Sequence, residues 1–274
     1  MQVRQDALCT KRPCPMISSD KYDMENVQLA KVMRSESKKG WTGRLVATDP
    51  TTGTSATIYM YEGGVYSVQV EDFTPQLTNR MIAAGILDDA RIGELSASVD
   101  KSQRDHEVGR FAVNRDWLPI DVLASFHAEY LLAGLGAALS MPKSKVQVDA
   151  LETTDQLCTL PTPVDDLIAA VDLREERSQR IWNGVAPGST TRETVLRQLN
   201  AHADICSASP EVTAFMKAVD GINTVDEIAG SCGFTRAEAI VITAALIAGG
   251  AVAIAGRKPV QGTHVPEDFA TASR

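Results

Sequence analysis

The sequence predicts an α+β protein with a small antiparallel sheet, tandem helical repeats after it, and a winged-helix-like unit near the C-terminal end. Three observations support this. Strand-forming residues flank a tight turn between Ser55 and Val70, a helical pattern recurs after Gln76, and two capping boxes surround Gly233. The 274 residues suffice for about two domains, and a hydrophobic fraction of 44% is ordinary for a core-forming protein.

The N-terminal third of the chain changes from helical to strand patterning. Residues 1–22 are polar and irregular, so we expect a disordered tail. Apolar residues at helical spacing predict a helix over Met24–Ser37, followed by a Lys-Lys-Gly stop. Glu62-Gly63-Gly64 is a hairpin signal between runs of β-branched and aromatic residues. The predicted strands are Trp41–Thr48, Ser55–Tyr61 and Val65–Val70.

A degenerate repeat follows the predicted sheet. The stretch QLTNRMIAAGILDDARI from Gln76 aligns without gaps with EVGRFAVNRDWLPIDVL from Glu107, at an offset of 31 residues. An offset kept across six positions indicates a structural duplication. Each unit is predicted to be a short helix, a turn, and a second helix that opens near Asp88 or Pro119. The six pairs are Leu77 with Val108, Ile82 with Val113, Gly85 with Asp116, Ile86 with Trp117, Leu87 with Leu118, and Ile92 with Leu123.

The rest of the chain alternates helices with short connections. Ser209-Pro210 supplies an N-cap and a first-turn proline for a helix through Val219. Thr224 and Thr235 each open a capping box, and a glycine turn between the two helices gives helix–turn–helix spacing. The other predicted elements are a buried helix over Tyr130–Met141, a strand and connection over Pro142–Pro163, a charged helix over Val164–Trp182, and a buried strand over Ala251–Ile254.

These elements divide the chain into five parts. We expect a tail over residues 1–22, an α+β domain over 23–160, a helical connector over 161–208, a winged-helix-like domain over 209–256, and a second disordered tail over 257–274.

The predicted sheet and repeats resemble the PATAN family of bacterial regulatory modules. The resemblance rests on the strand G-W-T-G-R-L, the sheet segment E-G-G-V-Y-S-V and the repeats, over Lys39–Leu151, together with the segment Glu211–Ala255. It implies a module that is joined to signalling partners and followed by a winged-helix-like segment.

The repeat unit also resembles the R-L-G-x-x-L-V-x-x-G-L-L pattern in the N-terminal domains of type II secretion and type IV pilus ATPases, some of which bind cyclic di-GMP. Here Gln76 and Glu107 occupy the arginine positions and Thr78 the first glycine position, whereas Gly109 retains the second. Because the groups that would face an anionic nucleotide are replaced, we do not expect cyclic di-GMP binding.

The sequence offers no recognisable catalytic, metal or cofactor motif. The loop Gly184–Thr191 has glycines and hydroxyls but no lysine to hold phosphates, so we expect it to cap a helix. The four histidines do not occur at metal-ligand spacing, and the five cysteines are scattered without a C-x-x-C. A net charge of −8 opposes non-specific binding to nucleic acid or anionic lipid.

A cytoplasmic location without a membrane anchor is expected. The first residues lack the apolar stretch of a signal peptide. The apolar run Ala239–Ala255 approaches the length of a membrane span, but Gly249-Gly250 interrupts it and charged residues flank it closely. A buried helix followed by a strand explains this run better.

We therefore expect a non-enzymatic regulatory or scaffold protein that acts through a protein partner, and by family analogy this partner is an ATPase or GTPase motor or a signalling protein. The alternatives are a transcription regulator that binds DNA through the winged helix, and an enzyme of unrecognised type. No catalytic, cofactor or metal residue is assigned. The candidate interaction surface consists of Trp117, Arg110, Arg115, Arg236, Arg257 and Lys258.

Overall fold

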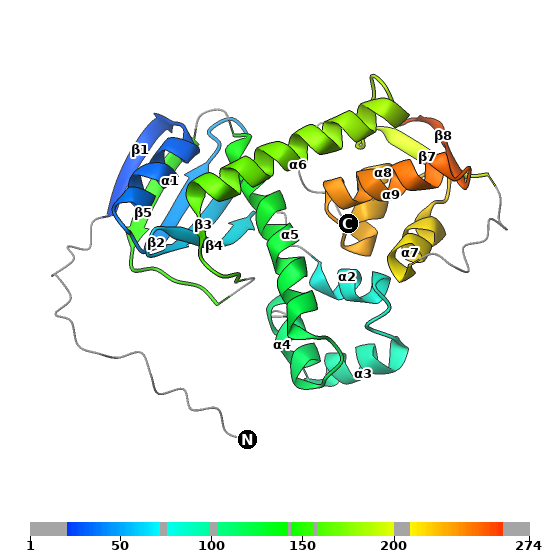
Figure 1. Cartoon of the computed structure of the whole chain (residues 1–274), viewed down its shortest axis with the longest axis horizontal. Helices are drawn as coiled ribbons and strands as arrows, with labels where there is room; N and C mark the ends of the chain where they lie inside the picture. The colour runs from blue at the N-terminus through cyan, green and yellow to red at the C-terminus, as the bar shows by residue number, and fades with distance from the viewer. Residues whose placement is uncertain are drawn as a thin grey trace.

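The computed structural model describes residues 21–71, 76–98, 104–141, 144–155, 158–199 and 209–259 (Figure 1). It has the predicted α+β architecture, with a sheet at one end, repeat helices projecting from it, and a helical C-terminal unit at the other end. The predicted tails lie almost wholly outside the described residues.

The sheet is antiparallel throughout, with strand order β1-β5-β2-β3-β4-β6. The predicted hairpin is confirmed as β3 and β4, and positive φ angles at Glu62 (47°) and Gly63 (82°) match the turn that such hairpins require. The strands are β1 (Lys21–Val27), β2 (Gly43–Thr48), β3 (Ser55–Tyr61), β4 (Gly64–Val70), β5 (Ser144–Ala150) and β6 (Thr162–Pro163).

The predicted helix over Met24–Ser37 begins later than expected. Lys21–Val27 forms β1, which pairs with β5 at the edge of the sheet, and α1 spans Leu29–Lys38. The prediction was wrong for this segment because β1 is held by a distant strand, which local periodicity does not indicate. Lys21 and Tyr22, assigned to the tail, also belong to β1.

Both repeat units form a helix, a turn and a second helix. The units are α2 (Leu77–Ala83) with α3 (Asp89–Ser98), and α4 (Arg104–Asn114) with α5 (Ile120–Leu139). Both turns are Schellman motifs at equivalent positions: Ile86 N–H donates to Met81 O, and Trp117 N–H to Ala112 O, each at 2.9 Å. The paired residues Gly85 and Asp116 both take the left-handed conformation. The predicted duplication is therefore present in the backbone geometry.

The second repeat helix is longer than the unit requires. It continues through the segment predicted as a separate helix over Tyr130–Met141, so that α5 reaches from the repeats to the sheet. Its small residues Ala133, Ala137 and Ala138 pack in the core between the sheet, α1 and the long helix α6 (Val164–Val185). By length and composition α5 is apolar enough to cross a membrane, but it packs inside the fold, as the core helices of soluble proteins do.

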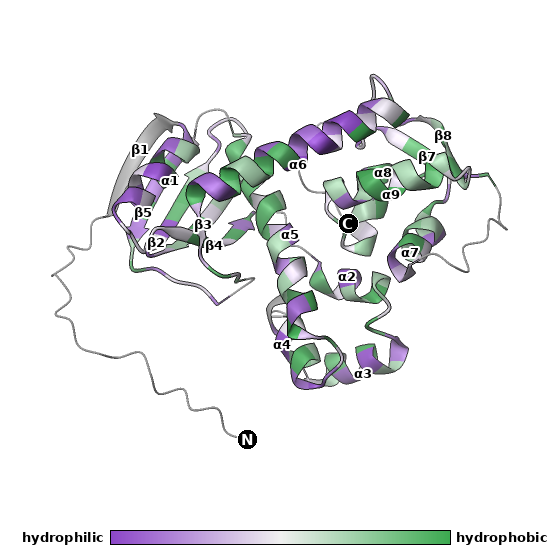
Figure 2. Cartoon of the chain, in the orientation of Figure 1, coloured by the Kyte–Doolittle hydropathy of each residue, from purple (hydrophilic) through white to green (hydrophobic). Residues whose placement is uncertain are grey.

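The C-terminal unit contains the predicted helices α7 (Pro210–Ala218), α8 (Val225–Cys232) and α9 (Arg236–Ala248). Ser209 caps α7, and both predicted capping boxes, at Thr224 and Thr235, are complete. Figure 2 shows that α8 and α9 are predominantly apolar, and they enclose a core with Phe215 and Trp182.

Two features of this unit differ from expectation. The segment expected to be a helical connector also contains β7 (Thr194–Gln198), which pairs with β8 (Val252–Arg257). The predicted strand over Ala251–Ile254 is buried at Ala251 and Val252, whereas Ile254 is exposed and β8 continues beyond it to Arg257. A two-stranded ribbon has no second layer to cover its outer face.

The turn between α2 and α3 provides a test of the repeat geometry. At Gly85, φ is +71°, and a side chain there would be strained; Gly93, in the interior of α3, has a helical φ and open space around it. We expect Gly85→Ala to lower the free energy of unfolding by about 1 kcal/mol. The control Gly93→Ala should raise it by about 0.5–1 kcal/mol. Urea denaturation measures both changes, and equal effects of the same sign would contradict the left-handed conformation of Gly85.

Candidate protein-interaction groove

The predicted interaction residues of the repeats lie on α4 and on the turn that follows it. Trp117 is half-buried. The centres of the Trp117 and Phe111 rings lie 5.4 Å apart in an edge-on arrangement, and the Arg91 guanidinium lies 5.5 Å from the centre of the Trp117 ring. The two predicted basic residues here are exposed and face carboxylates, Arg115 with Glu94 at 2.8 Å and Arg110 with Asp155 at 4.0 Å. Such exposed pairs contribute little stability.

The predicted basic residues of the C-terminal unit are each engaged by a carboxylate. Those contacts are Arg236 Nη2 with Asp226 at 2.8 Å, Lys258 Nζ with Glu227 at 3.0 Å, and Arg257 Nη1 with Glu193 at 3.8 Å. A paired carboxylate competes with any phosphate for the same donors. The six predicted residues therefore lie at two separate places, the repeats and the C-terminal unit (Figure 1), and do not form one surface.

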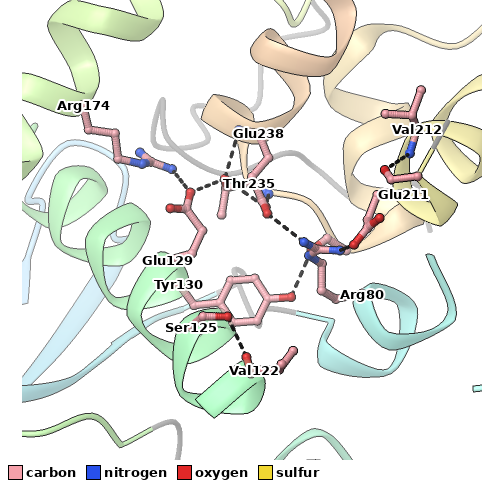
Figure 3. Close-up of polar contacts among 12 residues, drawn as sticks. Arg80, Val122, Ser125, Glu129, Tyr130, Arg174, Glu211, Val212, Thr235 and Glu238 are labelled. Atoms are coloured by element: carbon pink, nitrogen blue, oxygen red, sulfur yellow. Dashed lines mark hydrogen bonds and ion pairs between the residues drawn. The ribbon is translucent and has the colours of Figure 1, made fainter. Parts of the chain in front are cut away.

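A charged residue that sequence analysis did not select lies where these two units meet. Arg80 of α2 is 8% exposed, and its guanidinium lies between the rings of Phe126, at 4.5 Å, and Phe234, at 4.8 Å. Its Nη2 donates to Glu238 of α9 at 3.1 Å, and Nη1 is 3.8 Å from Glu211 of α7 (Figure 3). A buried guanidinium needs such partners because its desolvation is costly.

The repeat alignment contained a signal for this residue. The position equivalent to Arg80 in the second unit, 31 residues later, is Phe111, a partly buried apolar residue that packs against the repeat core. A charge at a position that the duplication marks as apolar indicates a special environment.

The turn between α8 and α9 packs directly on α2. Gly233 takes a φ of +71°, and a Cβ there would lie 2.5 Å from the backbone nitrogen of Arg80. The hydroxyl of Tyr130 on α5 donates to the Gly233 carbonyl at 2.9 Å. This close approach places the N-terminus of α9 beside Arg80, so the glycine serves the contact as well as the turn.

A second chain of polar contacts links α5, α6 and α9. Arg174 of α6 donates to Glu129 of α5 at 2.7 Å, and the Thr235 hydroxyl donates to the same carboxylate at 2.6 Å (Figure 3). Thr235 also accepts from the backbone N–H of Glu238 as the N-cap of α9. The capping box predicted from sequence is thus part of an interface among three helices.

These charges lie at the base of a groove of about 790 Å³ between α5, α6, α7 and α9. One face of α6 forms a wall, with contributions from Ala170 to Ile181 at helical spacing. The walls are mainly aliphatic, and two of their side chains are markedly exposed, Leu173 at 68% and Val241 at 44%. Exposed apolar side chains beside a groove are typical of an interaction surface.

The carboxyl of Glu238 has an unusual titration. Burial raises its pKa above the ordinary value, and the nearby Arg80 charge offsets this only in part.

Among the residues that the structure describes, no group of three or more histidine, cysteine or acidic side chains is arranged to hold a metal ion. The groove therefore offers shape, apolar area and buried charges.

Comparisons with protein-family models, with curated proteins and with solved structures found no match for this chain.

Removing the Arg80 charge should destabilise the protein strongly. Arg80→Met leaves the partly buried Glu238 without its main partner and removes the guanidinium from between two rings, and we expect the free energy of unfolding to fall by about 3 kcal/mol. Arg180→Met is the matched control, because Arg180 makes an exposed pair with Glu176, and its effect should stay below about 1 kcal/mol. Similar losses in both variants, measured by chemical denaturation, would refute a special role for Arg80.

The raised pKa of Glu238 predicts that the stability of the folded protein depends on pH. Because its folded pKa is raised above 4.5, the folded protein binds this proton more tightly than the unfolded chain. The stabilisation that this group provides is present below pH 4.5 and is lost as pH rises through the folded pKa. As pH rises, the melting temperature of Glu238→Gln should therefore increase relative to that of the wild type, and circular dichroism measures both. A constant or opposite difference would contradict the shift.

Proposed function

We propose that the chain is a non-catalytic regulatory or scaffold module that binds an amphipathic helix of a protein partner in the groove between α5, α6, α7 and α9. The observation that supports this most directly is the exposure of Leu173 and Val241 on two walls of one elongated groove. Helices bind such grooves with apolar residues at i, i+3, i+4 and i+7.

The dimensions of the groove suit a helix. The face of α6 that lines it runs from Ala170 to Ile181, and at about 1.5 Å per residue this is roughly 16 Å, or three turns. Leu173 and Val241 would remain partly exposed around a compact small molecule, whereas a helix lying along α6 would cover both. Arg177 on the rim is exposed and suits an acidic residue beside the partner's apolar face.

The identity of the partner and its location are proposed from the resemblance to PATAN modules. That resemblance points to a motor ATPase or GTPase, or a signalling protein, in the bacterial cytoplasm. No observation favours the DNA-binding alternative, since Arg236 is the only basic residue of α9 and donates to the buried Asp226.

The groove can be tested by capture from the native lysate with quantitative mass spectrometry. An aspartate at Leu173 or Val241 places a charge where the apolar face of the partner would pack, so Leu173→Asp and Val241→Asp should reduce the specific partner at least about tenfold. Ile120→Asp is the matched control, because Ile120 is 66% exposed on the repeats and away from the groove.

A partner retained equally by the groove variants, or lost equally with Ile120→Asp, would overturn the proposed site. Circular dichroism of each variant separates loss of binding from loss of folding.

A further inference from the structure

The charged side chains of the groove are balanced in total but not in their distribution. Three arginines and three glutamates line it, so the formal charge of the lining is zero. What a bound partner meets therefore depends on where each charge lies and on how far its neighbours compensate it. The six side chains are those of Arg80, Glu129, Arg174, Arg177, Glu211 and Glu238.

A series of polar contacts crosses the base of the groove from α6 to α7 (Figure 3). Its central link is the hydroxyl of Thr235, which lies 2.6 Å from one glutamate carboxylate and 3.2 Å from the next. The helices α6 and α7 therefore border the base from opposite sides. In order from α6, the series consists of Arg174, Glu129, Thr235, Glu238, Arg80 and Glu211.

The α6 side of the groove carries a cation without a carboxylate. Arg177 is exposed and makes no hydrogen bond or ion pair with the residues that the structure describes. Side chains three and four positions apart meet on one face of a helix, and none of these neighbours of Arg177 is acidic. They are Leu173, Arg174, Arg180 and Ile181. The positive charge of Arg177 is thus available to a bound partner.

The α7 side has the opposite imbalance, because two carboxylates face the single guanidinium of Arg80. Glu238 accepts a hydrogen bond from Arg80 Nη2 at 3.1 Å, whereas Glu211 lies 3.8 Å from Nη1, beyond hydrogen-bonding distance. The Nη1 atom accordingly has no hydrogen-bond acceptor within the described part of the chain. The Glu211 side chain is 29% exposed, so the less compensated carboxylate is the one that a partner can reach.

We propose that the groove selects an amphipathic helix with carboxylates along one flank of its apolar face and cations along the other, a selection that rests on the helix-binding function proposed above. The acidic flank faces Arg177 on α6, and the basic flank faces Glu211 on α7. Turning such a helix end for end would place like charges together on both sides. A given partner sequence therefore binds in one direction along α6.

Fluorescence anisotropy with synthetic peptides tests this selection on the full chain. Three peptides of about 15 residues, matched in helix content, share one leucine face. The first has glutamates on one flank and lysines on the other, the second has glutamates on both flanks, and the third has lysines on both. We expect the first peptide to bind the wild type most tightly. Arg177→Glu should favour the all-lysine peptide, changing the ratio of the Kd values of the first and third peptides by about fivefold or more.

Arg180→Glu is the matched control, because Arg180 is an exposed residue of α6 outside the groove lining. It should keep the wild-type ranking of the three peptides. At a salt concentration of about 1 M, where charges are screened beyond about 3 Å, the three peptides should bind the wild type with similar affinity.

The experiment separates failure of the charge selection from failure of the groove. Equal binding of the three peptides to the wild type, together with loss of all three in Leu173→Asp, would overturn the selection and leave a helix-binding groove. A ranking that Arg177→Glu does not change would overturn it as well. Absence of binding by all three peptides, or binding that Leu173→Asp does not weaken, would overturn the proposed function and the selection with it.

Discussion

The burial of the Arg80 guanidinium is the constraint on which the docking of the repeats against the C-terminal unit depends. A charge removed from water requires compensation from several directions, and here two aromatic rings and two carboxylates provide it. These groups come from α5, the turn before α9, α7 and α9, so they meet only when the repeats and the C-terminal unit are docked. The contact thus specifies one docking geometry, since a displaced unit would leave the charge buried without partners.

The same type of turn recurs on both sides of this contact. The α8–α9 connection is a Schellman motif like those of the two repeats, with Phe234 N–H donating to Ala229 O at 2.9 Å. Gly233 of this turn lies against the backbone of α2, and Pro210 at the start of α7 lies close to Gly85 of the first repeat turn. In each of these contacts a glycine turn of one unit packs against a helix of the other, where the backbone can approach closely.

Local sequence signals predicted the elements well, and their failures have a common physical cause. The hairpin at Glu62-Gly63, the caps at Ser209, Thr224 and Thr235, and the repeat turns depend on nearby residues, and all are present in the structure. By contrast, the strand Lys21–Val27 exists through pairing with β5, more than a hundred residues away. Hydrophobic periodicity within a short stretch of sequence does not indicate such a distant pairing partner.

The candidate sites were less predictable for the same reason. The groove is assembled from helices distant in sequence, and Leu173 or Val241 alone resembles an ordinary residue of an amphipathic helix. Arg80 was detectable in principle, through its alignment with the apolar Phe111.

Arg174 lines the groove and connects three of the helices around it. Its guanidinium donates to Glu129, which also accepts from Thr235 at the N-cap of α9. These contacts hold the start of α9, which forms one wall of the groove, against α5 and α6. Because the N-terminal half of α6 packs in the sheet core, this contact joins the groove to the sheet through one continuous helix.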